Sequence, residues 1–172
     1  LPAEEVFEDI APRLADVTGD GMPEIIVVQS ETRLGARLVI YDRRARLLAA
    51  TPHIGRRHRW LAPIGAADLD GDGQTELAYI DRPHLAKVLR VWRFDGTRLL
   101  PVAAEGGFSN HAIGDATITS AIRTCAQGPE MILPDAARTR LKAVRLATGR
   151  LLTRDIGPYR GPADLARARA CP

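Results

Sequence analysis

Three segments of the chain align with one another, and this internal repetition limits the fold more than any other feature of the sequence. A glutamate followed by an apolar run recurs at Glu24, Glu76 and Glu130, with spacings of 52 and then 54 residues. A second column, Arg-Leu-Leu, begins every 52 residues, at Arg46, Arg98 and Arg150. A period near fifty residues is typical of repeat architectures, in which each unit buries its apolar face against its neighbours.

The segments between the two columns have the pattern of strands. Residues 36–42, 87–95 and 140–149 alternate apolar with polar or charged residues, the period-2 pattern of a half-buried strand. Asp95-Gly96 and Thr148-Gly149 then mark hairpin turns into the Arg-Leu-Leu segments. Each repeat therefore contains about four short strands, the content of one propeller blade.

We accordingly predict an all-β fold of about three four-stranded blades, which form an incomplete β-propeller. The prediction treats residues 1–172 as a single repeat domain. Its repeats cover approximately residues 10–60, 61–115 and 116–160, and a C-terminal tail covers residues 161–172. Only the stretch 163–170 has a helical pattern, and it is short.

Two acidic loops occupy the same place in the first two repeats. They read DVTGDGMPE at residues 16–24 and DLDGDGQTE at residues 68–76, with oxygen-bearing side chains at the first, third, fifth and ninth positions and glycine at the sixth. Calcium takes about six to eight oxygen ligands, and the glycine permits the sharp turn that wraps a loop round the ion. We expect the seventh residue to offer its backbone carbonyl and the ninth to offer both carboxylate oxygens. The predicted ligands of two Ca²⁺ sites are Asp16, Thr18, Asp20, Met22 and Glu24, and Asp68, Asp70, Asp72, Gln74 and Glu76.

Calcium fits this layout better than the alternatives do. An EF-hand needs its bidentate glutamate at the twelfth position and flanking helices, whereas Val27 or Tyr79 stands there and a strand pattern follows. Zinc is disfavoured because neither loop contains Cys or His. Magnesium is disfavoured because it keeps its waters and tolerates crowded cages poorly. Plain Asp-Gly turns are the remaining alternative, and they do not explain two such loops in register with the repeat.

The number of carboxylates differs between the repeats. The second loop has four and the first has three plus Thr18, so we expect the second to bind calcium more tightly. The third repeat has Ile122, Thr124 and Ala126 where carboxylates would stand and keeps only Glu130, so we expect no metal there. A repeat that loses its ion yet keeps its strands indicates a structural metal.

The loop pattern, the strand that follows it and the period together resemble the FG-GAP or VCBS repeat family, which includes the β-propeller of integrin α-subunits and many bacterial secreted proteins. The resemblance covers most of residues 10–158. It implies one four-stranded blade per repeat, with calcium in the loop between the first two strands. Thr18 departs from the family's acid at that position, and the third repeat lacks the motif.

Closed propellers have about four to eight blades, so three repeats leave two blade edges unpaired. Such edges favour association with other chains. The sequence begins with Leu1 rather than Met, and we expect the ring to be completed by residues outside this sequence. A second chain or a strand from residues 1–9 are the alternatives.

Composition and residue spacing argue against several functional classes. The formal net charge is +3 and the arginines are spread along the chain, which favours solvated strand faces over a nucleic-acid patch. There is no apolar run of about 18 residues, so we expect no transmembrane segment. The histidines are scattered, and Ser109 and Ser120 lack the glycines of a nucleophile elbow, so no catalytic residue is predicted. Trp60 and Trp92 are either core residues or contacts for a sugar or peptide.

The two cysteines have one natural pairing. Cys125 lies in the degenerate loop of the third repeat and Cys171 lies next to the C-terminal residue. In an exported protein a disulfide between them would tie the tail to the repeat that lacks a metal. The alternative is two unrelated thiols.

These features favour a calcium-binding, non-enzymatic module, periplasmic or secreted, which binds an unidentified protein or glycan or acts as a scaffold. The location is inferred from the loops, because such sites fill where calcium is abundant. The alternative is the propeller domain of a polysaccharide-active enzyme such as a lyase. That function needs a cleft with convergent His, Tyr, Lys or Arg side chains, and the spacing of the residues reveals none.

Overall fold

The computed structural model describes residues 1–9 and 11–171 of the chain. The expected first residue of the first repeat, residue 10, and the last residue of the tail, residue 172, lie outside the described residues. Within the described part, thirteen strands form three antiparallel sheets, and one short helix follows them. The predicted all-β fold is confirmed.

The first sheet differs from the other two because its first strand is split. β1 (Glu5–Phe7) and β2 (Arg13–Ala15) both pair with β3 (Glu24–Glu31), β1 with the C-terminal half of β3 and β2 with its N-terminal half. β4 (Gly35–Tyr41) and β5 (Leu47–Ala50) complete this sheet. β1 and β2 therefore share the position that a single strand occupies in the other sheets.

The second and third sheets each have four strands in sequence order. The second contains β6 (Leu61–Ala67), β7 (Glu76–Asp81), β8 (Val88–Phe94) and β9 (Leu99–Gly106). The third contains β10 (Ala121–Cys125), β11 (Gly128–Pro134), β12 (Arg140–Ala147) and β13 (Arg150–Pro158). We call the three sheets blade 1, blade 2 and blade 3.

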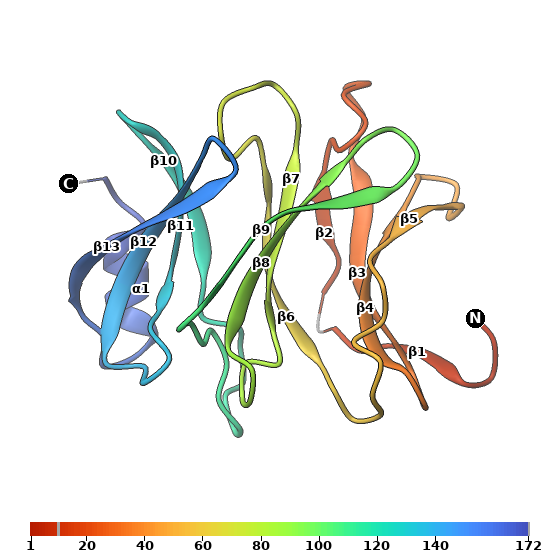
Figure 1. The fold of residues 1–172 in the computed structure, drawn as a ribbon, viewed down its shortest axis with the longest axis horizontal. Helices are drawn as coiled ribbons and strands as arrows, with labels where there is room; N and C mark the ends of the chain where they lie inside the picture. The colour runs from red at the N-terminus through yellow and green to blue at the C-terminus, as the bar shows by residue number, and fades with distance from the viewer. Residues whose placement is uncertain (10, 172) are drawn as a thin grey trace.

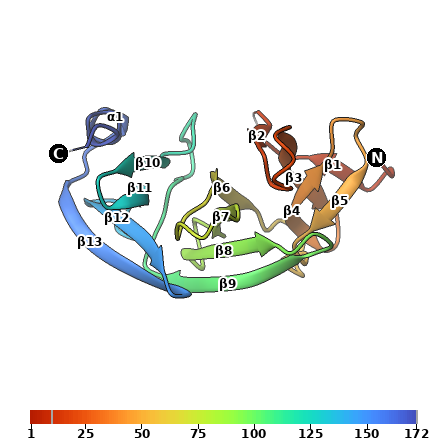
Figure 2. The same cartoon turned by 90° about the horizontal axis from the view of Figure 1, so that it is seen from above.

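The blades follow one another around an open arc. Figure 1 shows the three sheets side by side, and Figure 2 shows β2, β6 and β10 on the concave side with β9 and β13 on the convex side. β6 contacts both β2 and β10, and β9 contacts β13. The arrangement is that of an incomplete propeller, as the sequence predicts.

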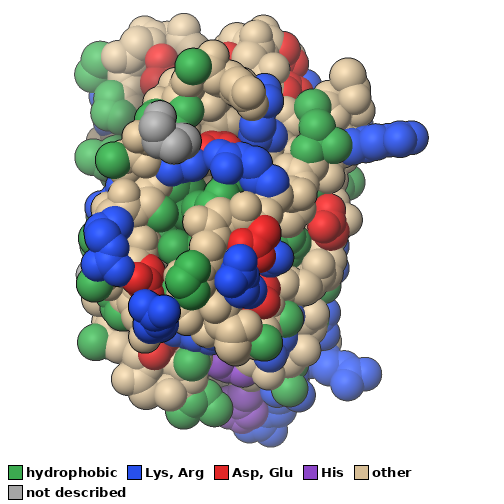
Figure 3. Space-filling view, turned by 90° about the vertical axis from the view of Figure 1, so that its left-hand side faces the viewer, with side chains coloured by type: hydrophobic (Ala, Val, Ile, Leu, Met, Phe, Trp, Pro, Cys, Tyr) green, Lys and Arg blue, Asp and Glu red, His purple; other side chains and the backbone are tan. Residues whose placement is uncertain are grey.

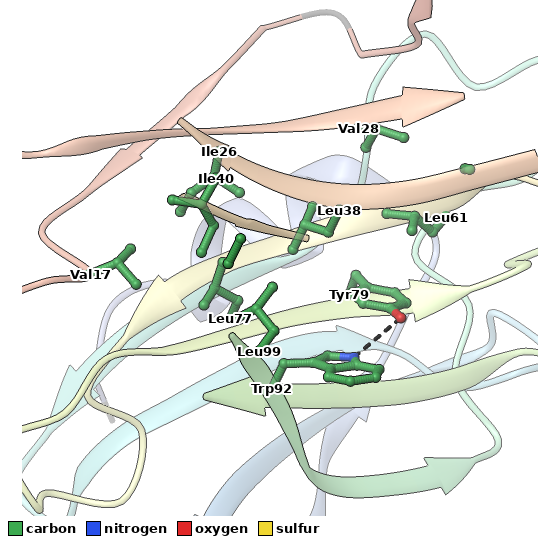
Figure 4. Close-up of a cluster of buried hydrophobic side chains, with 12 residues drawn as sticks. Val17, Ile26, Val28, Leu38, Ile40, Leu61, Leu77, Tyr79, Trp92 and Leu99 are labelled. Atoms are coloured by element: carbon green, nitrogen blue, oxygen red, sulfur yellow. Dashed lines mark hydrogen bonds between the residues drawn. The ribbon is translucent and has the colours of Figure 1, made fainter. Parts of the chain in front are cut away.

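The core lies between the blades because successive residues of the second strand point to opposite faces. Leu77 and Tyr79 of β7 pack against blade 1 in one apolar cluster, whose blade 1 members include Ile26 and Val28. Figure 4 shows this cluster, to which both β3 and β7 contribute side chains. The residues Ala78 and Ile80 of β7 belong to a second cluster, shared with Met131, Leu133, Val144 and Leu146 of blade 3. One face of blade 2 therefore packs against blade 1, and its opposite face packs against blade 3.

A buried pair of aromatic residues fixes the first interface. The indole N–H of Trp92 donates a hydrogen bond to the hydroxyl oxygen of Tyr79 over 3.2 Å, the contact drawn as a dashed line in Figure 4. Burial raises the pKa of Tyr79 to about 12. The hydroxyl therefore stays protonated at neutral pH and belongs to the core.

The free face of blade 3 is covered by the helix α1 (Pro162–Ala168). Leu165 of the helix packs in a small cluster with Ile132 and Leu141 of blade 3. The buried guanidinium of Arg123 donates to the carbonyl oxygens of Ala168 and Ala170 at the C-terminal end of the helix, where carbonyls lack partners within the helix. Figure 3 looks onto this end and shows basic side chains around a patch of hydrophobic ones.

A disulfide fastens the same end. Cys125 at the end of β10 is bonded to Cys171, with their Cα atoms 5.6 Å apart, so the proposed pairing is confirmed. The helical stretch expected at 163–170 is observed at Pro162–Ala168. In the described part of the chain, no helix has the length and apolar character needed to cross a membrane.

Candidate metal centres

The first acidic loop connects β2 to β3 and is organised by its first residue. Oδ1 of Asp16 accepts hydrogen bonds from the backbone N–H groups of Gly19 at 2.7 Å and Asp20 at 3.2 Å, and its Oδ2 accepts one from Gly21 at 2.9 Å. Three N–H donors on one carboxylate pull the backbone into a tight coil. The N–H of Met22 donates to Oδ1 of Asp20 at 2.8 Å.

The second loop, between β6 and β7, repeats this arrangement. Asp68 accepts from the N–H groups of Gly71, Asp72 and Gly73 at 2.7, 3.1 and 2.9 Å. The N–H of Gln74 donates to Oδ1 of Asp72 at 2.9 Å. The repeated sequence has therefore produced a repeated loop conformation, in which the first and fifth residues hold the backbone.

Two glycines in each loop have a backbone conformation that other residues rarely adopt. In the first loop, φ is 77° at Gly19 and 82° at Gly21, and the second loop has 82° at Gly71 and 87° at Gly73. The sequence analysis gave this role to the sixth position alone. The structure extends it to the fourth, because the left-handed conformation alternates along the coil.

The ninth-position glutamates are buried and tie each loop to the following strand. Glu24 is 4% exposed and Glu76 is fully buried. Oε2 of Glu24 accepts the N–H of Val17 at 2.8 Å, and Oε2 of Glu76 accepts the N–H of Leu69 at 2.8 Å. One oxygen of each glutamate therefore bonds the loop backbone.

The second loop brings its carboxylates together. Oxygens of Asp68, Asp70 and Glu76 lie within 4.8 Å of one another. Oδ1 of Asp70 is buried and has no hydrogen-bond partner. A buried carboxylate oxygen without a donor is costly, and a hard cation supplies what it lacks. These residues fit calcium.

Sequence reasoning missed a cation that the chain itself brings to the second loop. The guanidinium of Arg93, on β8, contacts three of the predicted ligands: Oε1 of Glu76 at 2.5 Å, Oδ2 of Asp70 at 2.7 Å and Oδ2 of Asp72 at 2.9 Å. Burial raises the pKa of Glu76 even with this guanidinium beside it. Arg93 therefore neutralises part of the charge that an ion would neutralise.

In the described part of the chain, no arginine contacts the ninth-position glutamate of the first loop as Arg93 contacts that of the second. The residue of blade 1 that corresponds to Arg93 is Asp42. Asp42 follows Tyr41, the cross-strand partner of Ile25, and Arg93 follows Trp92, the partner of Leu77. Among the described residues, no Lys or Arg forms an ion pair with Glu24, whose Oε1 instead accepts the hydroxyl of Thr18 at 3.3 Å. A hollow of about 400 Å³ lies here, lined by the oxygen-bearing side chains of Thr18, Asp20, Glu24 and Asp42 and also by Arg43, Arg44 and Arg46.

In the third repeat, two arginines neutralise the buried glutamate. Oε1 of Glu130 accepts from Nε of Arg123 at 2.6 Å and from Nη2 of Arg154 at 2.8 Å. Burial alone would raise the pKa of Glu130, but the two arginines outweigh it and hold the pKa below 4.5. Arg123 pairs with Glu130 in the register in which Ala15 and Ala67 pair with their glutamates. A larger, charged side chain thus stands where the acidic loops have alanine.

The two loops also touch each other. The hydroxyl of Thr75 in the second loop donates to the backbone oxygen of Asp16 in the first over 2.9 Å. Both loops lie at the same edge of the sheets, at the top of Figure 1. The second loop therefore contacts the backbone at the first ligand position of the first loop.

A separate polar cluster forms between loops that are distant in the sequence. Nδ1 of His111 lies 3.4 Å from Nε2 of His84, and the His111 ring meets Trp60 edge to face at 5.1 Å between centroids. A hollow of about 430 Å³ is lined by residues that include Phe7, Trp60, His111 and Asp115. Burial first, and the charge of His111 second, hold the pKa of His84 below its usual value. The histidines are scattered in the sequence, but the fold brings two of them together.

Comparison with known proteins agrees with the loops and the blades. Residues 16–79 match the model of the FG-GAP-like repeat, which begins here at the first residue of one acidic loop and ends in the strand after the other. The predicted resemblance to FG-GAP-like repeats is confirmed for this segment. No protein of curated function and no solved structure matches the chain.

Proposed function

We propose that this chain, which contains an FG-GAP-like repeat at residues 16–79, is a calcium-stabilised binding or scaffold module that works in the periplasm or outside the cell. The FG-GAP-like repeat is a structural repeat, and the metal has a structural role in this proposal. The module has no enzymatic activity of its own. Its ligand is a protein or a glycan.

One observation carries the calcium proposal. The repeated glutamate is buried in all three repeats, and an arginine neutralises it in the second and third but not in the first. An isolated buried carboxylate is unfavourable. A calcium ion in the first loop supplies the missing positive charge, with Asp16, Asp20 and Glu24 as its acidic ligands. The hollow beside the loop is also lined by Arg43, Arg44 and Arg46, and among the described residues Arg46 pairs with Asp42 and not with Glu24.

The second loop binds calcium in competition with Arg93. The unpartnered Oδ1 of Asp70 supports a cation there, but the guanidinium contacts three of the ligands and has to leave at least some of them. Arg93 thus favours an order of affinity opposite to the one that the number of carboxylates predicts. We propose that the first loop binds calcium more tightly.

The disulfide supports the proposed location. Cys125 and Cys171 are bonded to each other, and structural disulfides persist in oxidising compartments such as the periplasm and the extracellular space. Calcium is also abundant outside the cell, where loops of moderate affinity are filled. The disulfide and the proposed calcium sites support the same compartment.

Calorimetric titration of the chelator-treated protein with calcium tests the proposal. We expect two binding events, of which Glu24→Gln removes the tighter and Glu76→Gln the weaker. Glu4→Gln is the matched control, because Glu4 is exposed and lies outside both loops. Absence of any calcium binding by the wild-type protein would refute the proposal, and an unchanged titration of both loop variants would place the ions elsewhere.

A specific observation favours a glycan over a protein as the ligand. The hollow beside Trp60 and the pair His84 and His111 combines aromatic and hydrogen-bonding groups, the combination on which sugars stack and bond. This is also the convergent polar cleft that the polysaccharide-active alternative needs. Binding of an oligosaccharide array to the wild type but not to Trp60→Ala supports the glycan ligand, and release of products would support the enzyme.

A further inference from the structure

Two segments of the chain hold three arginines within four residues, at 43–46 and at 56–59. The first lines the hollow beside the first acidic loop, and its Arg46 pairs with Asp42. The second lies in the loop between β5 and β6, which Figure 1 shows at the bottom of the sheets, at the edge opposite the acidic loops. We call residues 56–59 the basic loop.

The arginines of the basic loop have no carboxylate partner in the part of the chain that the structure describes. Arg56 and Arg57 are exposed and Arg59 is half-buried, and none of the three forms an ion pair. Nε of Arg57 donates to Nε2 of His58 at 3.1 Å, and Nη1 of Arg59 donates to the carbonyl oxygen of His58 at 3.3 Å. Most of the donors on these guanidinium groups therefore face solvent or a ligand.

Backbone contacts hold the basic loop against the turn between β3 and β4. The N–H of Ala36 donates to the carbonyl oxygen of Arg59 at 2.9 Å. A Cβ at Gly35 would collide with the carbonyl oxygen of Arg56, so only glycine permits this approach. His58 has a φ of 55°, a conformation that is costly for residues other than glycine and is found at ligand-binding sites. A loop fixed in this way loses little conformational entropy when a ligand binds.

The basic loop leads directly to the hollow of about 430 Å³ that Trp60 lines. Arg59 precedes Trp60, whose indole N–H donates to the carbonyl oxygen of Glu8 at 2.9 Å. Arg56 and Trp60 are four residues apart, so at most about 15 Å of chain separates them. A chain-like ligand that has one unit in the hollow can therefore reach the guanidinium groups.

The carboxylates around the hollow are already bonded to other side chains. The three that line it have these partners: Asp115 has Arg138, Asp9 has Arg13, and Glu8 has Ser30. Glu31, at the end of β3, accepts hydrogen bonds from the backbone of the turn that follows it. The basic loop is therefore the part of this edge that favours an anionic group.

We propose that Arg56, Arg57 and Arg59 bind the carboxylates of an acidic polysaccharide, one sugar of which lies against Trp60. The proposal rests on the glycan ligand proposed above and adds that this glycan is a polyanion. Guanidinium groups match carboxylates with two parallel hydrogen bonds, and the apolar faces of sugars pack on aromatic rings. The disulfide and the proposed location outside the cytoplasm favour a polysaccharide over a nucleic acid.

Calorimetric titration with oligogalacturonate, beside its fully methyl-esterified form, tests the proposal. The ester keeps the sugar chain and has no charge, so we expect it to bind at least about tenfold more weakly. Arg56→Ala combined with Arg57→Ala should weaken the binding of oligogalacturonate at least about tenfold and leave that of the ester unchanged. The matched control combines Arg150→Ala with Arg169→Ala. Both of these arginines are exposed and lie away from the basic loop, at the start of β13 and at the end of α1, and their removal takes away the same two charges.

The outcomes separate this inference from the glycan proposal on which it rests. Equal binding of the acid and its ester, lost in Trp60→Ala, overturns the acidic ligand and leaves the glycan proposal standing. Binding of neither overturns it too, and the oligosaccharide array then decides the glycan ligand separately. An equal loss in the two double variants would show an effect of net charge alone. Single-stranded DNA that binds as tightly as oligogalacturonate of the same charge would replace the polysaccharide by a nucleic acid, and either result refutes the proposal.

Discussion

Replacing Arg93 with alanine separates the two cations that compete for the second acidic loop. In the wild type the guanidinium contacts Asp70, Asp72 and Glu76 at 2.5–2.9 Å. Removal of one partner from a buried ion pair costs about 3–5 kcal/mol. Because the Arg93 side chain keeps 22% of its surface exposed, we expect the metal-free variant to lose roughly 2–3 kcal/mol of unfolding free energy.

The same substitution should strengthen calcium binding at this loop. The ion no longer has to displace the guanidinium, so the free energy of displacement is added to its binding free energy. With about 1.4 kcal/mol per factor of ten, a displacement free energy of roughly 2–3 kcal/mol corresponds to a gain in affinity of about thirtyfold to about 140-fold. Calcium at about a hundredfold excess over Kd then returns about 2.7 kcal/mol, which offsets the loss of stability.

Two measurements on one set of proteins test this reasoning. Thermal unfolding with EDTA and with calcium gives the stability of each form, and calorimetric titration in a Glu24→Gln background gives the affinity of the second loop alone. Arg90→Ala is the matched control, because Arg90 lies on the same strand and pairs with Asp81 at 2.9 Å, outside the loop. An Arg93→Ala variant that binds calcium no more tightly than the wild type refutes the competition, even if both proteins bind the ion.

The remaining predictions concern the stability of the whole chain. Chelation of calcium should lower the melting temperature of the wild type by several degrees, and Glu24→Gln should reduce that difference, as measured by scanning calorimetry. Replacing Cys125 and Cys171 with serine should cost about 4 kcal/mol in the chain-entropy model for a separation of 46 residues, measured by urea unfolding, and an unchanged midpoint would contradict it. The pKa of Glu130 is held below its ordinary value of 4.5. Its contribution to the free energy of unfolding is therefore complete above that pH and is lost as the pH falls below it. Glu130→Gln should flatten the dependence of this free energy on pH in the same range.

The blades and the loop conformations were predictable because they depend on local sequence. The alternation in 36–42 and 87–95 identifies strands without knowledge of their partners, and the glycines of the acidic loops specify a coil that Asp16 and Asp68 hold with backbone hydrogen bonds. The period then orders the blades. The strand pattern and the loop conformation each involve residues within a few positions of one another.

The side chains that complete the sites were not predictable in the same way. Arg93 is 17 residues from Glu76. Their contact depends on the register between β7 and β8, and the alternating pattern does not distinguish registers that differ by two residues. His84 and His111 are 27 residues apart and belong to different loops. The division of the first strand of blade 1 into β1 and β2 also has no signal in the aligned columns, because the other repeats have a single strand there.

The repeated glutamate connects the fold to the proposed chemistry. Its Oε2 bonds the loop backbone in the first two repeats, so the carboxylate is needed to join the loop to the second strand whether or not an ion is present. A buried carboxylate requires a positive charge, and the position of that charge is free to vary. In blade 3 it comes from Arg123 and Arg154, and in blade 2 from Arg93. Among the described residues of blade 1 no side chain supplies it, so the first loop is where loss of calcium should affect the fold most.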